Sequence, residues 1–512
     1  MVPQTDNVTR SLRVGWPART PTSMALVVGS VAFAVRYALT GAIENDHFVT
    51  FARAVQVLYG DLPVRDFEDP GFPLSYLLST AVAAVFGPSL LVNVLLCVLL
   101  LAVTSAVTYL LVFRATESQT AAIVAGAFTV AVSPRLYNAT KVIVPVVAIW
   151  LSWRYADNPR PRRLVALALW SAVAFLLRHD YLIYVALGNI VLLITCHSRV
   201  PRRAALRVAA YAVLSLLFIL PWLLYVQLHE GLPSYFSSAL RFTVAEGRRT
   251  ATGSLPWVFF AFAAIPVAGV IVSFRRGLHL SRGELASAAV MLLSLDVVFL
   301  RDVLAARIPD VAAPTAIVAA AAAAHVLSTR TVTRGAMIAA ILIVALQITT
   351  KTSAPPEPAR AFRRLSDITQ RLRRVSPEIM PNPSLAPLVG YLARCTGLDD
   401  RVVVAGFGPE IPLLAHRPFA ARLPSWIPGY YDDSAEVDRA LMQLDHERLG
   451  AAVFLDGSMV VARFWPALLQ AIRARGFEEY AVAAVNSRVR VWLPHATDAP
   501  RDSATNLPCS AH

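Results

Sequence analysis

The stretch Glu44–Leu78, ENDHFVTFARAVQVLYGDLPVRDFEDPGFPLSYLL, combines a dense mixture of acids and bases with two amphipathic patterns. It follows directly on an apolar run. Apolar side chains recur at helical spacing in residues 47–59, and again in residues 72–86 after the Pro70-Gly71 break. We expect both segments to be helices that lie in the headgroup plane of a membrane.

The rest of the chain is typical of a membrane protein with many spans. Of its 512 residues, 56% are hydrophobic and only 16% are charged, and the mean hydropathy is +0.56. A soluble domain carries roughly 25% charged residues. Apolar runs of about 15–22 residues predict about eleven transmembrane helices. They lie near residues 24–41, 89–113, 119–133, 142–154, 164–177, 181–196, 208–226, 255–274, 285–300, 311–327 and 335–350.

Arginines orient these spans. The net charge is +14, and lysine occurs only at Lys141 and Lys351. Runs of arginine occupy gaps that all fall on one side if the N-terminus is cytoplasmic, as the positive-inside rule requires. These arginines are Arg10, Arg13, Arg19, Arg114, Arg160, Arg162, Arg163, Arg199, Arg202, Arg203, Arg207, Arg275, Arg276, Arg282, Arg330 and Arg334. The basic charge therefore indicates topology and lipid contact in a plasma (inner) membrane, and no nucleic-acid partner is expected.

The sequence predicts an all-α polytopic membrane protein with a small extracytoplasmic α/β domain at its C-terminus. RVVVAG (401–406), AAVFLDG (451–457) and SRVRVWL (487–493) are typical of strands, and FWPALLQAIRARG (464–476) is typical of a helix. We expect a cytoplasmic tail at 1–22, a membrane module at 23–350 with its first outer loop at 42–88, a Pro-rich linker at 351–359, and the outer domain at 360–512. Cys395 and Cys509 could pair if that domain faces an oxidising compartment.

Two carboxylates follow the first span, Glu44 and Asp46. One interpretation is structural: Asn45 or Asp46 caps the helix that follows. The other is catalytic: Asp46 is a general base at the membrane surface, and Glu44 is the alternative base.

The loop PVRDFEDPG also allows two interpretations. It could be an Asp-Pro-Gly turn with local ion pairs. Alternatively, Arg65 reaches a substrate phosphate.

Three short outer corners place cations beside acids or aromatic rings: SPRLYNATK (133–141), RHD (178–180) and FLRDVLAARIPD (299–310). Interfacial anchoring explains some of these side chains. A single pocket that binds a phosphate explains the repetition better, because guanidinium groups grip phosphate in a bidentate manner. Asp180 is the candidate second acid. The candidate substrate-binding residues are Arg135, Tyr137, Lys141, Arg178, His179 and Arg301.

No cofactor is certain. Glu44, Asp46, His47, His179 and Asp180 could converge on a divalent cation, but no ligand spacing typical of a metal site supports it, and we assign no metal ligand. The chain has no Walker motif, nucleophile elbow or Cys-x-x-Cys pair.

The acid after the first span, followed by FARAVQVLYGDLPVRDFEDPGFPLSYLL, resembles the first outer loop of the GT-C glycosyltransferases, the superfamily of the protein O-mannosyltransferase-like and aminoarabinose-transferase-like enzymes. The three corners are similar to those of bacterial members, and the resemblance covers about residues 20–350. It implies a helical membrane module with two juxtamembrane helices, a sugar donor carried on a polyprenyl monophosphate, and Asp46 as the base. The order Glu-Asn-Asp-His departs from the Asp-Glu pair frequent in that superfamily.

The sequence thus favours an inverting glycosyltransferase that acts on an acceptor of the cell envelope. A transporter or lipid flippase is the alternative, although the charges lie at the ends of the spans rather than at their middles. A third possibility is a scaffold whose outer domain binds a glycan or a partner.

Overall fold

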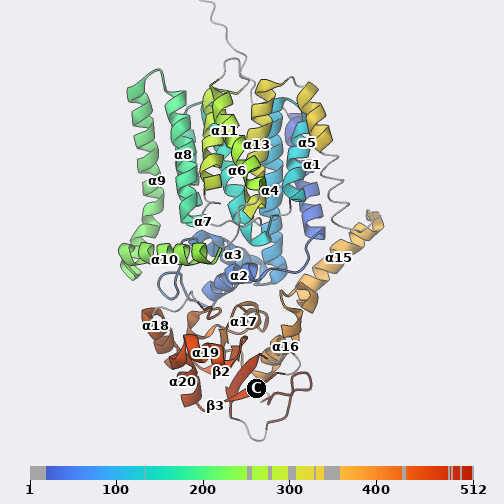
Figure 1. The fold of residues 1–512 in the computed structure, drawn as a ribbon, viewed down its shortest axis with the longest axis vertical. Coiled ribbons are helices and arrows are strands. Elements are labelled where there is room, and N and C mark those ends of the chain that lie inside the picture. The colour runs from blue at the N-terminus through green and yellow to red at the C-terminus, as the bar shows by residue number, and fades with distance from the viewer. Residues whose placement is uncertain are drawn as a thin grey trace, which may run out of the picture.

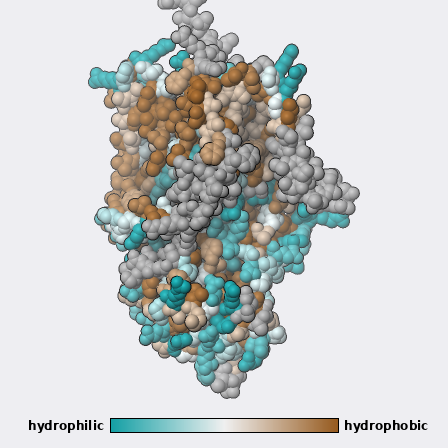
Figure 2. All heavy atoms as spheres, viewed as in Figure 1, coloured by the Kyte–Doolittle hydropathy of each residue, from teal (hydrophilic) through white to brown (hydrophobic). Residues whose placement is uncertain are grey.

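The computed structural model describes residues 19–132, 134–250, 257–274, 280–297, 307–327, 330–339, 358–428, 434–482, 485, 488–495 and 499–509. A bundle of long helices forms one end of the molecule, and a smaller domain with a sheet forms the other (Figure 1). Hydrophobic side chains dominate the bundle on the face shown in Figure 2, and hydrophilic ones dominate the smaller domain.

The bundle helices coincide with the predicted spans. Ten are described in full: α1 (Arg19–Ala38), α4 (Leu90–Thr116), α5 (Gln119–Ala131), α6 (Ala139–Asp157), α7 (Pro161–Leu177), α8 (His179–Cys196), α9 (Pro201–His229), α11 (Trp257–Ser273), α12 (Arg282–Val297) and α13 (Ile308–Val326). The eleventh predicted span begins in a helix at 330–339 and continues outside the described residues.

Six of the described helices are long and apolar enough to cross a membrane, and the segments concerned are Pro21–Ala38, Leu90–Thr116, Leu136–Asp157, His179–Cys196, Pro201–His229 and Ile308–Val326. The chain is therefore a polytopic membrane protein. Helix α4 lies inside the bundle and packs against α1, α5, α6 and α13. Its buried face includes Val94, Val98 and Leu111. Apolar packing along this helix of 27 residues therefore stabilises the bundle.

Both segments of the first outer loop that the sequence predicts to be helical are helices. Helix α2 (Asn45–Leu58) and helix α3 (Pro73–Phe86) pack against each other, and they lie across the end of the bundle that faces the smaller domain (Figure 1). Helix α10 (Leu232–Thr250) lies beside them at the same level. This helix lies between the predicted spans 208–226 and 255–274, in a stretch for which the sequence analysis predicts no helix. Its polar residues conceal the amphipathic pattern when only apolar runs are counted.

The smaller domain contains the predicted strands and one more. Strands β1 (Arg401–Ala405), β2 (Leu449–Phe454), β3 (Phe477–Ala481) and β4 (Arg490–Pro494) form a sheet in the order β1-β2-β4-β3. β1 and β2 are parallel, and β4 is antiparallel to both β2 and β3. Strand β3 was not predicted, because the two consecutive acids in its sequence FEEYA interrupt the apolar pattern typical of a strand.

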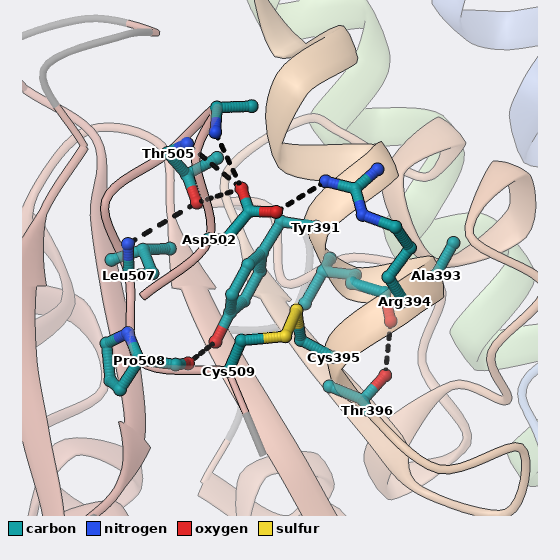
Figure 3. The surroundings of a disulfide bond; sticks show 12 residues. Tyr391, Ala393, Arg394, Cys395, Thr396, Asp502, Thr505, Leu507, Pro508 and Cys509 are labelled. Carbon is teal, nitrogen blue, oxygen red and sulfur yellow. Dashed lines mark hydrogen bonds and ion pairs between the residues drawn. A yellow bond between two sulfur atoms is a disulfide. The ribbon is translucent and has the colours of Figure 1, made fainter. Parts of the chain in front are cut away.

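Helices surround this sheet and connect it to the bundle. They are α15 (Pro358–Arg374), α16 (Ala386–Cys395), α17 (Glu410–Leu414), α18 (Ser434–Asp445), α19 (Ser458–Phe464) and α20 (Pro466–Ala474). Helix α15 packs against α1 and α4, and the Tyr37 hydroxyl lies 2.8 Å from the Thr369 hydroxyl. Cys395 and Cys509 form a disulfide, beside which Tyr391 donates to the Pro508 carbonyl at 2.6 Å (Figure 3). This disulfide ties the last residues of the chain to α16.

Candidate functional site

The first candidate base lies at the start of α2. This helix begins at Asn45, Glu44 occupies the N-cap position without a side-chain capping bond, and Asp46 lies in the first turn. The interpretation of Asn45 or Asp46 as the helix cap is therefore wrong. Asp46 is exposed at the end of the bundle where α2 lies, so its carboxylate is open to a substrate.

Two residues of the first outer corner hold these carboxylates. Arg135 Nε lies 3.2 Å from Glu44 Oε1, and Arg135 Nη1 donates to the Tyr137 hydroxyl at 2.7 Å. Tyr137 in turn interacts electrostatically with Asp46. Burial raises the pKa of Glu44, Arg135 opposes this rise, and the nearby charge of Asp46 adds to it. Four predicted residues thus form one group of two acids, one cation and one phenol.

Lys141 connects this group to a second one. Its ammonium lies 5.4 Å from the centre of the Tyr137 ring. It also interacts electrostatically with Arg178, Asp180, Arg307 and Asp310. The site is therefore continuous from the carboxylates of α2 to the cations at the starts of α6, α8 and α13.

Arg178 and Asp180 form an ion pair at the start of α8, with Arg178 Nε 2.8 Å from Asp180 Oδ1. Burial lowers the pKa of Arg178, but Asp180 and the neighbouring tyrosines outweigh this effect and leave the pKa raised. The guanidinium stays charged at any physiological pH, so the corner supplies a fixed positive charge.

His179 lies on the other side of this corner and supports the first outer loop. Its backbone N–H donates to the Gly71 carbonyl at 3.0 Å, and its Nε2 lies 3.1 Å from the Tyr235 hydroxyl. Gly71 has φ +104, and a Cβ there would lie 2.6 Å from His179 Nδ1. Glycine at this position therefore allows the turn to approach α8. The side chain of His179 lies against this turn and against Tyr235 of α10.

Asp69 anchors the same turn. Its Oδ1 accepts from the backbone N–H groups of Gly71 and Phe72, both at 3.1 Å, and from the Tyr76 hydroxyl. Its Oδ2 accepts from the Tyr235 hydroxyl of α10 at 2.6 Å. The Asp-Pro-Gly segment is thus a turn stabilised by its own aspartate, as the structural interpretation of this loop expected.

Arg65 lies apart from the phosphate-binding candidates. It pairs with Asp66 at 2.5 Å and donates to the Gly60 carbonyl at 3.0 Å, which is the local pairing that one interpretation predicted. Arg301 lies outside the described residues. His47 is buried, and burial lowers the pKa of His47 to about 4, so its imidazole is neutral at physiological pH. Within the described ranges, no three His, Cys, Asp or Glu side chains group closely enough to hold a metal ion.

The structure adds three residues to the site that are not among the candidate residues: Asn138, Arg307 and Asp310. Asp310 is buried, and Asn138 Nδ2 donates to its two oxygens at 3.0 and 2.9 Å. Both lie in corners that we had singled out for their cations. A carboxylate at the first turn of an apolar run was the available signal, because a buried acid requires a partner.

Comparisons with known proteins bear on the fold. Neither a family model nor a curated protein sequence matches the chain. Among solved structures, ArnT from Cupriavidus metallidurans bound to undecaprenyl phosphate superposes with a TM-score of 0.56 at 15% identity, over 95% of this chain and 100% of that chain.

Two further structures match at lower TM-scores. Arabinosyltransferase EmbB from Mycobacterium smegmatis gives 0.39 at 13% identity, over 75% of this chain and 44% of that chain. The archaeal oligosaccharyltransferase AglB from Archaeoglobus fulgidus, in complex with an inhibitory peptide and a dolichol-phosphate, gives 0.45 at 11% identity, over 94% of this chain and 75% of that chain. The full-length match to ArnT, together with the bundle, the two juxtamembrane helices and the sheet-containing domain, shows that this chain has the GT-C fold.

Proposed function

We propose that the protein is a membrane glycosyltransferase that transfers a sugar from a polyprenyl monophosphate to a hydroxyl of a cell-envelope acceptor, which is a lipid, a glycan or a protein. The observation that carries this proposal is the continuous site in which Tyr137 interacts electrostatically with Asp46 and its ring lies beside the ammonium of Lys141. An acid that can accept a proton thus lies next to cations that can bind a phosphate. The bound undecaprenyl phosphate of ArnT supports this class of donor.

We assign separate roles in the reaction to the carboxylate and to the cations of this site. Asp46 accepts the proton of the acceptor hydroxyl as its oxygen bonds to the anomeric carbon of the sugar. The bond from that carbon to the phosphate oxygen breaks, and its electron pair leaves with the polyprenyl phosphate. Lys141, Arg178 and Arg307 stabilise the added negative charge of this leaving group. Attack opposite to the phosphate inverts the anomeric carbon, as in other single displacements.

Asp310 and Asp180 have a different part in this proposal. Both interact with Lys141, and Asp180 also pairs with Arg178. Without them, several cations would lie together at membrane depth, where unbalanced charge is costly. We assign Asp180 and Asp310 to holding the cations in place until the donor phosphate arrives.

We place the site on the extracytoplasmic side of the plasma (inner) membrane, with the N-terminus cytoplasmic. The arginine runs of the predicted gaps support this orientation. The Cys395–Cys509 disulfide supports it too, because disulfides persist in oxidising compartments. The lipid-linked donor lies in the bilayer, so its phosphate reaches the interface where α2, α3 and the outer corners gather.

The test uses the purified protein in proteoliposomes. Asp46→Asn should abolish transfer from a panel of undecaprenyl-phosphate sugars while native mass spectrometry still detects bound undecaprenyl phosphate. Glu44→Gln should retain part of the activity, since we assign Asp46 as the base. Full activity in Asp46→Asn would refute the assignment of the base. Movement of labelled undecaprenyl-phosphate sugar between leaflets without any transfer would instead favour the flippase.

A further inference from the structure

Arg422 of the C-terminal domain contacts the first outer loop through both its backbone carbonyl and its side chain. The Arg422 carbonyl accepts from Gln56 Nε2 at 2.8 Å and from Arg53 Nη1 at 3.1 Å. Its guanidinium pairs with Asp66, and its Nε lies 3.6 Å from Asp61 Oδ1. Helix α17 of the same domain also packs against α2.

The partners of Arg422 form a connected network on the loop side. Arg53 Nη1 donates to Gln56 Oε1 at 2.9 Å, and Gln56 Nε2 donates to Asp61 Oδ2 at 3.2 Å. The Arg53 guanidinium lies 4.4 Å from the centre of the Phe67 ring. Arg53, Gln56 and Asp61 are all less than a tenth exposed. Buried polar groups of this kind specify one arrangement, because each is costly without its partner.

The backbone at this point adopts an unfavourable conformation. Ala421 and Arg422 have φ +54 and +56, in the left-handed region that side chains with a Cβ disfavour by roughly 1–2 kcal/mol per residue. The Ala421 N–H donates to Glu447 Oε2 at 2.6 Å, which helps to hold the turn. Such a conformation persists only where the surroundings enforce it. Here it directs the carbonyl and the side chain of Arg422 to the same loop.

Helix α2, which Arg422 contacts, also carries the proposed base. Asp46 lies in the first turn of α2, while Arg53 and Gln56 lie in its last two turns. A helix of 14 residues is a stiff rod about 21 Å long. A shift at one end therefore moves the carboxylate at the other end.

We infer that Arg422 is a positioning residue, and that the C-terminal domain sets the place of Asp46 by holding α2 and the loop after it. This inference rests on the proposed function. The cations that we assign to the donor phosphate lie on α6 and in the corners before α8 and α13. Among the described residues, Arg422 forms its hydrogen bonds and ion pairs with the first outer loop instead. Loss of the contacts between Arg422 and the first outer loop should therefore lower the turnover rate and leave binding of the lipid phosphate intact.

The test measures kcat for sugar transfer and the Kd for undecaprenyl phosphate in the full-length protein. Arg422→Ala and Asp66→Asn should each lower kcat by about 100-fold, the loss expected when a reacting group moves by about 1 Å. The Kd should stay within about twofold. The double variant should lose no more than either single variant, because both remove one interaction. Arg422→Lys, which keeps the charge, should recover part of the lost kcat.

Arg394→Ala is the matched control. It removes another arginine–aspartate pair, with Asp502, inside the C-terminal domain, and it should keep the original kcat. An unchanged kcat in Arg422→Ala alongside an inactive Asp46→Asn would overturn the inference while leaving the proposed function intact. Equal losses of turnover and lipid binding would reduce Arg422 to a structural role and would also overturn it. An active Asp46→Asn would refute the proposed base itself, and with it the positioning of that base.

Discussion

The hydroxyl of Tyr137 interacts electrostatically with the carboxylate of Asp46. Asp46 belongs to the helix that follows the first span, whereas Tyr137 lies in the short turn Leu136–Asn138 before α6. The same hydroxyl accepts from Arg135 at 2.7 Å. Tyr137 thus lies between Arg135 and the proposed base.

Tyr137→Phe should lower kcat by about tenfold or more and change the thermal unfolding temperature little. The substitution removes the hydrogen bond from the charged guanidinium of Arg135, and such a bond is worth about 1.5–3 kcal/mol. Transfer assays in proteoliposomes measure the effect. Tyr391→Phe, which also loses one tyrosine hydrogen bond but within the C-terminal domain, should retain full kcat. A Tyr137→Phe enzyme as fast as the original would remove Tyr137 from the site.

Lys141→Met should weaken binding of undecaprenyl phosphate by about tenfold or more. The substitution removes a charge next to Arg178 and Arg307 at the proposed phosphate site, and a charged hydrogen bond is worth at least one factor of ten. Titration with undecaprenyl phosphate in detergent micelles gives the Kd. Arg65→Ala is the control, because Arg65 pairs with Asp66 away from this cluster. Comparable losses in the two variants would contradict this location of the phosphate.

Asp69→Ala should lower the free energy of unfolding by about 3 kcal/mol. The buried carboxylate accepts from two backbone N–H groups and from two tyrosines, and unpaired buried groups cost about 1–3 kcal/mol each. Asp69→Asn keeps one carbonyl acceptor and should lose less. Thermal unfolding followed by circular dichroism compares them. If Asp69→Ala unfolds at the original temperature, this network does not hold the loop.

Cys395→Ser should destabilise the C-terminal domain by about 4 kcal/mol. The disulfide joins residues 114 positions apart, and closing a loop of this length constrains the unfolded chain strongly. Thermal unfolding with and without a reducing agent should differ in the original protein. In Cys395→Ser the two curves should coincide. A midpoint that ignores the reductant in the original protein would contradict this role.

Glu410→Gln should stabilise the protein above neutral pH. Glu410 is buried at the start of α17, one of its carboxylate oxygens has no hydrogen-bond partner within the described residues, and burial raises the pKa of Glu410 to about 7. The folded state thus holds this proton more tightly than the unfolded state does. The resulting stability is complete below the pKa of an ordinary glutamic acid, and it is lost as the pH rises through about 7.

The glutamine variant should lose that part of the pH dependence. Its advantage at pH 8 should be about 2–3 kcal/mol, since one pKa unit corresponds to about 1.4 kcal/mol. Unfolding midpoints measured from pH 5 to pH 8 test this. Identical pH profiles of the two proteins would show that Glu410 does not titrate in this range.

Local patterns in the sequence are sufficient for most elements of this fold. The run of α4, the stripes of α2 and α3, and the strands β1, β2 and β4 were all predictable, because a helix in lipid and a buried strand need apolar residues at their own spacing. The exceptions, α10 and β3, have mixed sequences. Their packing against other elements, rather than their own pattern, decides their structure.

The candidate site was predictable in its parts but not in its connections. Glu44, Asp46, Arg135, Tyr137 and Lys141 could be named because charged groups beside apolar runs are rare and costly. Their grouping through Tyr137 depends on how α2 lies against the turn before α6. Arg65 pairs with its sequence neighbour Asp66 rather than with the residues that we propose to bind the phosphate.

Hydropathy and residue spacing act over one or two turns of chain, and they are enough to specify the long apolar helices of the bundle and the helices α2 and α3. Some contacts join positions separated by more than a hundred residues. These are the contacts of Arg422 with Gln56 and Asp66, and the hydrogen bonds of Asn138 with Asp310. No local pattern encodes such contacts. They arise only when the packed helices and the C-terminal domain bring those side chains within hydrogen-bond distance.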